Sequence, residues 1–321
     1  MDRVDRLRQQ GLADNTLAAY KKAERYFFAW ARLHGHRDPS YPVPSKLIEK
    51  FALDHLYGLK PEVERALIRS GVKAKKGKHT VSTIQAKIDG LSYFHKINNC
   101  DPNPCRTQVV RDCLSSGRRI ESKSGIVKKK SKAITKQVLD RMIRTIPTES
   151  LIGKRDRAIL IFGFYSGGRR RNEIATAEMR FLSPMMGGGY EYYLHRSKTD
   201  QDGKGKQKII RAKYAKSIRQ YLNAAGIVDG YIFRVIDNGR VTDRHISGHD
   251  INILIKKYIE RIGEDPKKYS AHGIRRGFIT TCGRMGVPLF DVMDLTDHRD
   301  IRTVVQYYEE GKITTNPATM I

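Results

Sequence analysis

The sequence has few cysteines, and their spacing is not that of a zinc site. The chain has 321 residues and four cysteines, Cys100, Cys105, Cys113 and Cys282. A site built from His95, Cys100 and Cys105 is the alternative, but its ligand spacing is wrong for zinc. We therefore expect buried or free thiols in a reducing compartment.

Long apolar runs are also missing. The longest, such as residues 158–165, are far too short to cross a bilayer. The N-terminus is charged and lacks the apolar segment of a secretory signal. These absences predict a cytoplasmic protein, or a nuclear one in a eukaryote.

Acidic residues are scarce as well. The chain carries 34 aspartates and glutamates against 61 lysines and arginines, which gives a formal net charge of +27 and a pI near 10.0. Such an excess predicts a polyanionic partner, and nucleic acid is the leading candidate. A membrane surface is the alternative, but no basic amphipathic helix with an opposite face rich in tryptophan or phenylalanine stands out. We therefore expect a nucleic-acid partner and no membrane partner.

Hydrophobic patterning divides the chain into two domains. With 39% hydrophobic residues, the chain is long enough for two cores. Residues 1–114 are expected to be all-helical, because apolar residues recur at helical spacing between glycine- and proline-containing breaks. Residues 133–321 are expected to be mainly helical with a small antiparallel sheet, whose strands fall at residues 190–196 and 207–212. The predicted fold class is mainly α, with an α+β second domain.

Residues 115–132 join the two predicted domains and are polar and strongly basic. One interpretation is a solvated, flexible hinge. The other is a strap that lies on nucleic-acid phosphates, which the concentration of charge favours. The candidate phosphate-binding residues of this segment are Arg118, Arg119, Lys128, Lys129, Lys130 and Lys132.

The second domain contains a glycine-arginine turn and a basic hairpin. Gly167 and Gly168 precede three arginines and the start of a helix, a pattern that suits a tight turn presenting cations. A lysine-rich hairpin with Lys198 connects the two predicted strands. It is not a phosphate-binding P-loop, because Gly-x-x-x-x-Gly-Lys-Ser/Thr does not occur.

Chemistry-bearing residues concentrate near the C-terminus. His272 and Arg275 are three residues apart and share a helix face. His298 follows, and then a tyrosine pair in a helix whose apolar pattern puts Tyr308 on the buried stripe and Tyr307 at its edge. Helix phase therefore favours Tyr307 if one of the pair is a nucleophile. Two histidines, an arginine and a tyrosine in one short segment suit chemistry on a phosphodiester.

These motifs resemble the signature of the tyrosine recombinase, or phage integrase, family, and in particular its Cre-like simple site-specific recombinases. The matching elements are Gly-x-Arg-x-x-Glu-Ile, a Ser-Lys-Thr hairpin after a strand, His-x-x-Arg, and a histidine nine residues before a tyrosine. The catalytic residues implied by the resemblance are Arg170, Glu173, Lys198, His272, Arg275, His298 and Tyr307. Arg169 is the alternative to Arg170, because the motif falls in an arginine triplet. Asp297 departs from the family, which commonly has glycine there, and it places a carboxylate beside His298.

The resemblance implies a role for each residue. Two arginines can fork onto the oxygens of a phosphodiester under attack. A histidine can accept the tyrosine proton and a lysine can protonate the leaving 5′ oxygen, with His272 and Lys198 as candidates. His298 would hydrogen-bond the phosphate, and Glu173 would support the site. The product is a 3′-phosphotyrosyl enzyme, and this chemistry calls for no metal and no cofactor.

The resemblance also implies an architecture and a task. The all-helical first domain resembles the core-binding domain of Cre-like enzymes, and the two domains would form a clamp on duplex DNA. Two protomers are expected on an inverted-repeat site and a tetramer in synapsis, associated with the nucleoid in a bacterium. The alternatives are an integrase, transposon or telomere-resolving enzyme of the same chemistry, or a non-catalytic DNA-binding protein of this fold.

Overall fold

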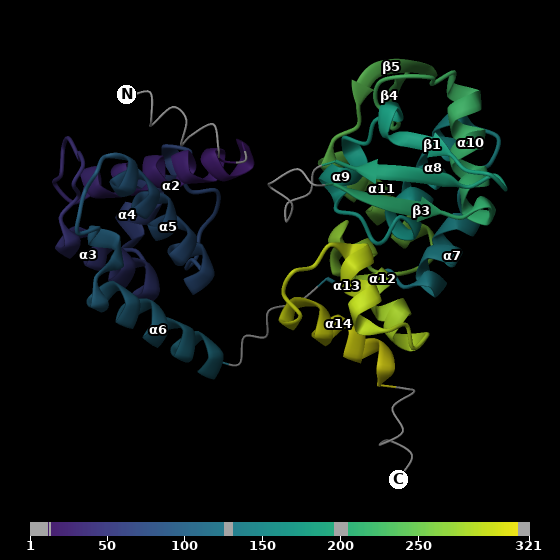
Figure 1. Ribbon diagram of the computed structural model, residues 1–321. Coiled ribbons are helices and arrows are strands. Elements are labelled where there is room, and N and C mark those ends of the chain that lie inside the picture. Colours follow the sequence, from purple (N-terminus) through teal and green to yellow (C-terminus); the bar gives the residue numbers. More distant parts are fainter. Residues whose placement is uncertain (1–11, 13, 125–130, 196–204, 314–321) are drawn as a thin grey trace, which may run out of the picture. The chain divides into compact units, whose positions relative to one another are not determined.

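The computed structural model describes residues 12, 14–124, 131–195 and 205–313. The chain forms two compact units, Met1–Lys128 and Lys129–Ile321. Each has its own hydrophobic core, so each is described by itself (Figure 1).

The described part of the first unit is built from helices. They are α2 (Asp14–Leu33), α3 (Ser45–Tyr57), α4 (Pro61–Arg69), α5 (Val81–Ile97) and α6 (Gln108–Lys123). The core forms around Phe27, Trp30 and Phe51, which are fully buried. The prediction of an all-helical N-terminal region is confirmed.

Helix α6 corrects the predicted interdomain segment. The sequence predicted a flexible stretch from residue 115, but α6 continues to Lys123. Two contacts explain the extension. Gly117 is buried against Leu56, which would have to shift to admit a Cβ, and Glu121 accepts a hydrogen bond from the Val81 amide at 3.3 Å. The prediction failed because most residues after 114 are basic or polar. Only a narrow face of this part of α6 packs against the first unit.

The second unit combines helices with two small antiparallel sheets (Figure 1). Its helices are α7 (Lys136–Arg144), α8 (Leu151–Tyr165), α9 (Arg171–Ala175), α10 (Ala212–Ala225), α11 (Gly248–Arg261), α12 (His272–Arg284), α13 (Leu289–Thr296) and α14 (Arg302–Lys312). Helix α8 is buried from Ala158 to Phe164, in agreement with its nearly continuous apolar sequence.

One sheet contains β1 (Leu182–Pro184), β2 (Tyr190–Leu194) and β3 (Lys206–Ile210) in that order. Tyr192 and Leu194 face the core and Tyr193 faces outward, as the alternation predicted. The second sheet pairs β4 (Arg234–Asp237) with β5 (Arg240–His245), a hairpin that the sequence analysis did not predict. It lies at the opposite end of the unit from α12–α14 (Figure 1).

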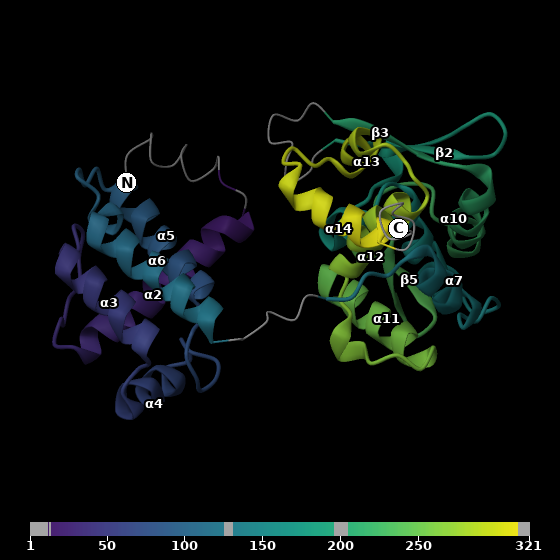
Figure 2. The ribbon, with the colours of Figure 1, turned by 90° about the horizontal axis from the view of Figure 1, so that it is seen from below.

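Helices α12, α13 and α14 enclose a small core of their own. Helices α12 and α14 lie side by side in both views (Figures 1 and 2). They approach closely because each contributes a glycine: a Cβ at Gly283 would collide with the Tyr308 carbonyl, and one at Gly311 with the Thr280 carbonyl. The helix that carries the tyrosine pair is therefore fixed directly against the helix that carries His272 and Arg275.

The structure also bears on the cysteines and on membranes. All four cysteines are free. Both ring nitrogens of His95 are engaged, with Leu91 O at 2.8 Å and the Val43 amide at 3.0 Å. Within the described ranges, no group of three or more histidine, cysteine or acidic side chains is arranged to hold a metal. No helix of these ranges is long and apolar enough to span a membrane.

Candidate active site

The turn between α8 and α9 presents the arginines. Gly167 and Gly168 both adopt positive φ, at +97° and +66°, which favours glycine. Side chains there would also collide with the Leu295 carbonyl and crowd Arg275. The prediction of a tight turn is confirmed, and the turn brings Arg169 into contact with Leu295 and Asp297 at the end of α13.

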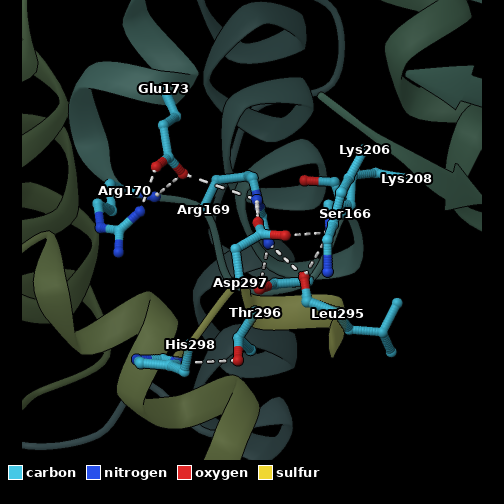
Figure 3. A network of polar contacts seen from close by, with 12 residues as sticks. Ser166, Arg169, Arg170, Glu173, Lys206, Lys208, Leu295, Thr296, Asp297 and His298 are labelled. Atoms are coloured by element: carbon cyan, nitrogen blue, oxygen red, sulfur yellow. Dashed lines mark hydrogen bonds and ion pairs between the residues drawn. The ribbon is translucent and has the colours of Figure 1, made fainter. Parts of the chain in front are cut away.

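Glu173 holds the start of α9 and the Arg170 side chain together. Its carboxylate accepts hydrogen bonds from the Arg170 amide at 3.0 Å and from Arg170 Nη1 at 2.6 Å. The Arg170 side chain remains 23% exposed, while that of Glu173 is 8% exposed (Figure 3). Arg170 is thus oriented by a buried carboxylate and keeps part of its guanidinium accessible.

Arg169 occupies a different environment from Arg170. Its side chain is fully buried and donates to Asp297 Oδ2 at 2.6 Å, to the Gly167 carbonyl at 2.9 Å and to the Leu295 carbonyl (Figure 3). The Arg169 guanidinium is enclosed and paired with the Asp297 carboxylate, whereas the Arg170 guanidinium stays partly exposed. The geometry therefore favours Arg170, as the motif register did.

Asp297 adopts a left-handed backbone conformation of the kind that glycine often supplies at the end of a helix. Its φ of 54° and ψ of 44° lie in the left-handed region, which aspartate tolerates better than most residues. Its carboxylate lies between Arg169 and Lys208, whose Nζ is 2.8 Å from Oδ1 (Figure 3). Burial alone raises the pKa of Asp297, but the Arg169 charge and the Lys208 hydrogen bond outweigh it and hold the pKa below its ordinary value.

Sequence reasoning missed Lys208. This lysine on β3 is 1% exposed and donates to the carbonyls of Asp294 and Leu295 at the C-terminal end of α13. Desolvation, and then the nearby Arg169 charge, lower its pKa. The available signal was strand alternation, because Lys208 shares the inward phase with Ile210.

His298 and Arg275 are in direct contact. Arg275 on α12 is 1% exposed and donates to the carbonyls of Gly168, at 3.2 Å, and Thr296. Its Nε lies 3.4 Å from His298 Nε2, and Thr296 Oγ1 lies 2.6 Å from His298 Nδ1. Thr296 Oγ1 donates to the Val292 carbonyl, so it accepts from a protonated Nδ1. His298 Nε2 then carries the lone pair that faces Arg275.

The electrostatics of this group keep its histidines neutral. Desolvation, followed by the charges of Arg275 and Arg170, lowers the pKa of His298 to about 3. His272, the first residue of α12, is exposed at the surface. Desolvation, followed by Arg275 and Arg170, lowers its pKa as well. Burial lowers the pKa of Arg275 to about 9, so its guanidinium stays charged at neutral pH.

The tyrosine pair divides as helix phase predicted. Tyr308 is 4% exposed, and its hydroxyl donates to the Val287 carbonyl. Tyr307 is half-buried, and its ring lies against the Arg276 guanidinium, with Cζ 4.8 Å from the ring centroid. The Tyr308 hydroxyl is therefore engaged in a hydrogen bond that stabilises the fold.

The remaining predicted site residues divide into two groups. Lys198, Lys128, Lys129 and Lys130 lie outside the described residues. Arg118 and Arg119 are exposed on α6, and Arg118 donates to Gln85 Oε1 at 3.0 Å. Lys132 is exposed and pairs with Glu264 at 3.6 Å. Among the described candidates, Arg170, Glu173, His272, Arg275 and His298 come together, and Tyr307 is carried on the helix packed against α12.

The comparisons with known proteins agree with this arrangement. An integrase/recombinase xerD homolog from Selenomonas ruminantium is 27% identical over 314 residues, which cover 95% of this chain and 84% of the relative. The tyrosine recombinase XerD of Xanthomonas campestris pv. campestris is 25% identical over 214 residues, which cover 61% of this chain and 62% of the relative.

Two solved structures share the fold at 13% sequence identity. One is the Tn1549 transposon integrase in complex with transposon right end DNA, with a TM-score of 0.60 over 99% of this chain and 96% of that one. The other is the XerH site-specific recombinase in a post-cleavage complex with palindromic difH substrate, with a TM-score of 0.52 over 97% of both chains. Residues 132–312, more than half of the chain, match the phage integrase family, and the protein therefore belongs to that family of tyrosine recombinases.

Proposed function

We propose that this protein is a site-specific DNA recombinase that cleaves and rejoins duplex DNA through a covalent 3′-phosphotyrosyl intermediate on Tyr307. The assignment of residues rests on the different environments of the two tyrosines, in a unit that also holds a cluster of arginines and neutral histidines. The Tyr308 hydroxyl is bonded to the Val287 carbonyl, and Tyr307 lies on α14, which packs against α12, the helix that carries Arg275 and His272.

Each residue of the site has a role in the proposed reaction. Arg170 and Arg275 stabilise the charge that develops on the phosphate oxygens. His272 is neutral because of its lowered pKa, and can therefore accept the proton of the Tyr307 hydroxyl. The Tyr307 oxygen forms a bond to phosphorus as the bond to the 5′ oxygen breaks. Lys198 supplies the proton to that leaving oxygen, and the reverse attack by a 5′-hydroxyl rejoins the strand. Glu173 orients Arg170, and His298 donates to the phosphate in the tautomer that carries the proton on Nε2 rather than on Nδ1.

The proposed partner is duplex DNA. The net charge of +27 supports it, as do the DNA complexes of the two structural neighbours. We assign DNA binding to the first unit, including α6, and to the basic residues that follow α6, and strand cleavage to the second unit. Two protomers on an inverted-repeat site, and a tetramer joining two sites, complete the proposal. The protein would work in the cytoplasm, on the nucleoid in a bacterium.

A trapping assay tests the proposed chemistry. The protein is incubated in EDTA with a nicked duplex that carries the recognition site, sought in the DNA that flanks the gene, and then denatured. We expect a covalent protein–DNA band that is lost in Tyr307→Phe and retained in Tyr308→Phe. Loss only in Tyr308→Phe would reassign the nucleophile. Tight, salt-sensitive binding to the site without any adduct would identify a non-catalytic DNA-binding protein instead.

A further inference from the structure

Arg276 makes a set of contacts that the proposed reaction does not use. It follows Arg275 on α12 and is 12% exposed. Its Nη2 lies 2.7 and 2.6 Å from the two carboxylate oxygens of Glu310, and its Nη1 donates to the Ser131 carbonyl at 2.6 Å. The same guanidinium lies against the Tyr307 ring. This side chain of α12 thus touches two segments that are far apart in the sequence, the stretch at Ser131 and helix α14.

On one side, these contacts fix the nucleophile's helix. Tyr307 and Glu310 are three residues apart on α14 and share a face. Arg276 contacts both the Glu310 carboxylate and the Tyr307 ring. In addition, Thr280 Oγ1 on α12 donates to the Tyr307 carbonyl at 3.1 Å. A planar guanidinium suits this double task, because it forks onto a carboxylate and also stacks on an aromatic face.

On the other side, Arg276 reaches the segment through which the chain enters the second unit. Ser131 to Ile134 run along α12, with hydrogen bonds from Lys132 N to Lys268 O at 2.7 Å and from Ile134 N to Gly273 O at 2.9 Å. A Cβ on Gly277 would collide with the Ile134 carbonyl, and one on Gly273 would press on the Lys132 carbonyl. The two glycines form the groove in which this entry segment, residues 131–134, lies.

We propose that Arg276 is a positioning residue for Tyr307 that couples the nucleophile to the entry segment, so that strand cleavage depends on how the chain leaves the DNA-binding unit. This inference rests on the proposed function of Tyr307. Residues 131–134 follow directly on the basic stretch assigned to DNA, and any displacement of Ser131 acts on the same guanidinium that orients the Tyr307 ring. A shift of about 1 Å in a reacting group is enough to slow a reaction roughly 100-fold.

Single-turnover adduct formation on the nicked duplex, at saturating protein, tests the proposal in the full-length chain. We expect Arg276→Gln to slow the adduct roughly 100-fold without weakening DNA binding. Arg276→Lys keeps a cation but cannot fork, so its rate should lie between those of the wild type and Arg276→Gln. Arg284→Gln, an exposed position on the same helix, is the matched control and should react at the wild-type rate. Circular dichroism checks that each variant is folded.

A double-mutant cycle tests the coupling to the entry segment. Gly273→Ala pushes on Lys132 and should also slow cleavage. If the segment acts through Arg276, the Gly273→Ala/Arg276→Gln pair reacts no more slowly than Arg276→Gln alone. Multiplicative losses would overturn the coupling, and a wild-type rate in folded Arg276→Gln would overturn the positioning role. A wild-type protein without any adduct would instead be a failure of the proposed function itself.

Discussion

Arg169 and Asp297 form a buried ion pair, with Arg169 Nη1 2.6 Å from Asp297 Oδ2 and side-chain exposures of 0% and 8%. The pair joins the turn that presents Arg170 to the turn that presents His298. Lys208 from β3 pairs with the other carboxylate oxygen, so the α8–α9 turn and β3 both contact the residue that follows α13. Asp297 therefore has a structural role, in which its carboxylate pairs with two buried cations.

Removing the Asp297 charge should destabilise the second unit strongly. Asp297→Asn keeps a residue that tolerates the left-handed conformation. It leaves Lys208 buried without its carboxylate partner, and leaves Arg169 only the more distant Glu173 carboxylate, 3.8 Å away. Breaking a buried pair in this way costs about 3–5 kcal/mol. Urea denaturation followed by circular dichroism measures the loss. Asp300→Asn, which removes the exposed pair with Arg302, is the control and should change stability little. Equal effects of the two substitutions would contradict the role assigned to Asp297.

The close packing of α12 on α14 gives a prediction about catalysis. Gly283→Ala directs a Cβ at the Tyr308 carbonyl and must displace α14, and with it Tyr307. We expect adduct formation on the nicked duplex to slow roughly 100-fold while DNA binding is unchanged. Gly286→Ala, at φ +69° with open space around it, introduces strain of about 1 kcal/mol without moving α14, and should cleave normally. Normal cleavage in folded Gly283→Ala would show that α14 tolerates displacement.

The first unit should lose stability in mild acid. Desolvation lowers the pKa of both His55 and His79 to about 4, against about 6.5 for an unfolded chain. Between these values the unfolded state binds more protons, so the stabilising contribution is complete above about pH 6.5 and is lost as the pH falls toward 4. Trp30 is the single tryptophan and lies in this core, so its fluorescence follows this unit alone.

His79→Gln tests this pH dependence. The His79 ring bonds only the Tyr26 hydroxyl, at 3.2 Å, among its described contacts, whereas His55 is held by both Tyr26 and Phe51. The variant should therefore fold and show a smaller decrease in stability between pH 6.5 and pH 4. An unchanged pH dependence would mean that His79 is protonated in the folded protein.

Much of the site was predictable from local sequence. The phase of one apolar stripe separates Tyr307 from Tyr308, and the glycine pair before Arg169 and Arg170 requires a tight turn. Both features depend on residues within a few positions of one another. The same reasoning located β2 and β3, because alternation over five residues is a local signal.

The features that sequence reasoning missed depend on distant contacts. The partner of Asp297 lies 128 residues away in the sequence, and that of Arg276 at Ser131 lies 145 residues away. Residues after 114 are helical because Gly117 packs on Leu56, which no local pattern indicates. Arginines and lysines in so basic a chain are expected at the surface. A buried Arg169 or Lys208 is recognisable only once the fold brings a carboxylate to it.

The exposed arginines of α6 should contribute to DNA affinity through phosphate contacts. Arg118 is already bonded to Gln85, so Arg119 is the better probe. Because each neutralised phosphate releases counterions, Arg119→Gln should reduce the slope of log K against log salt by about 0.9 and weaken binding alike for cognate and unrelated duplexes. Lys46→Gln, an exposed lysine on α3, removes the same charge from another helix and should leave the slope unchanged. An unaltered slope in Arg119→Gln would place the phosphate contacts elsewhere and return α6 to a purely structural role.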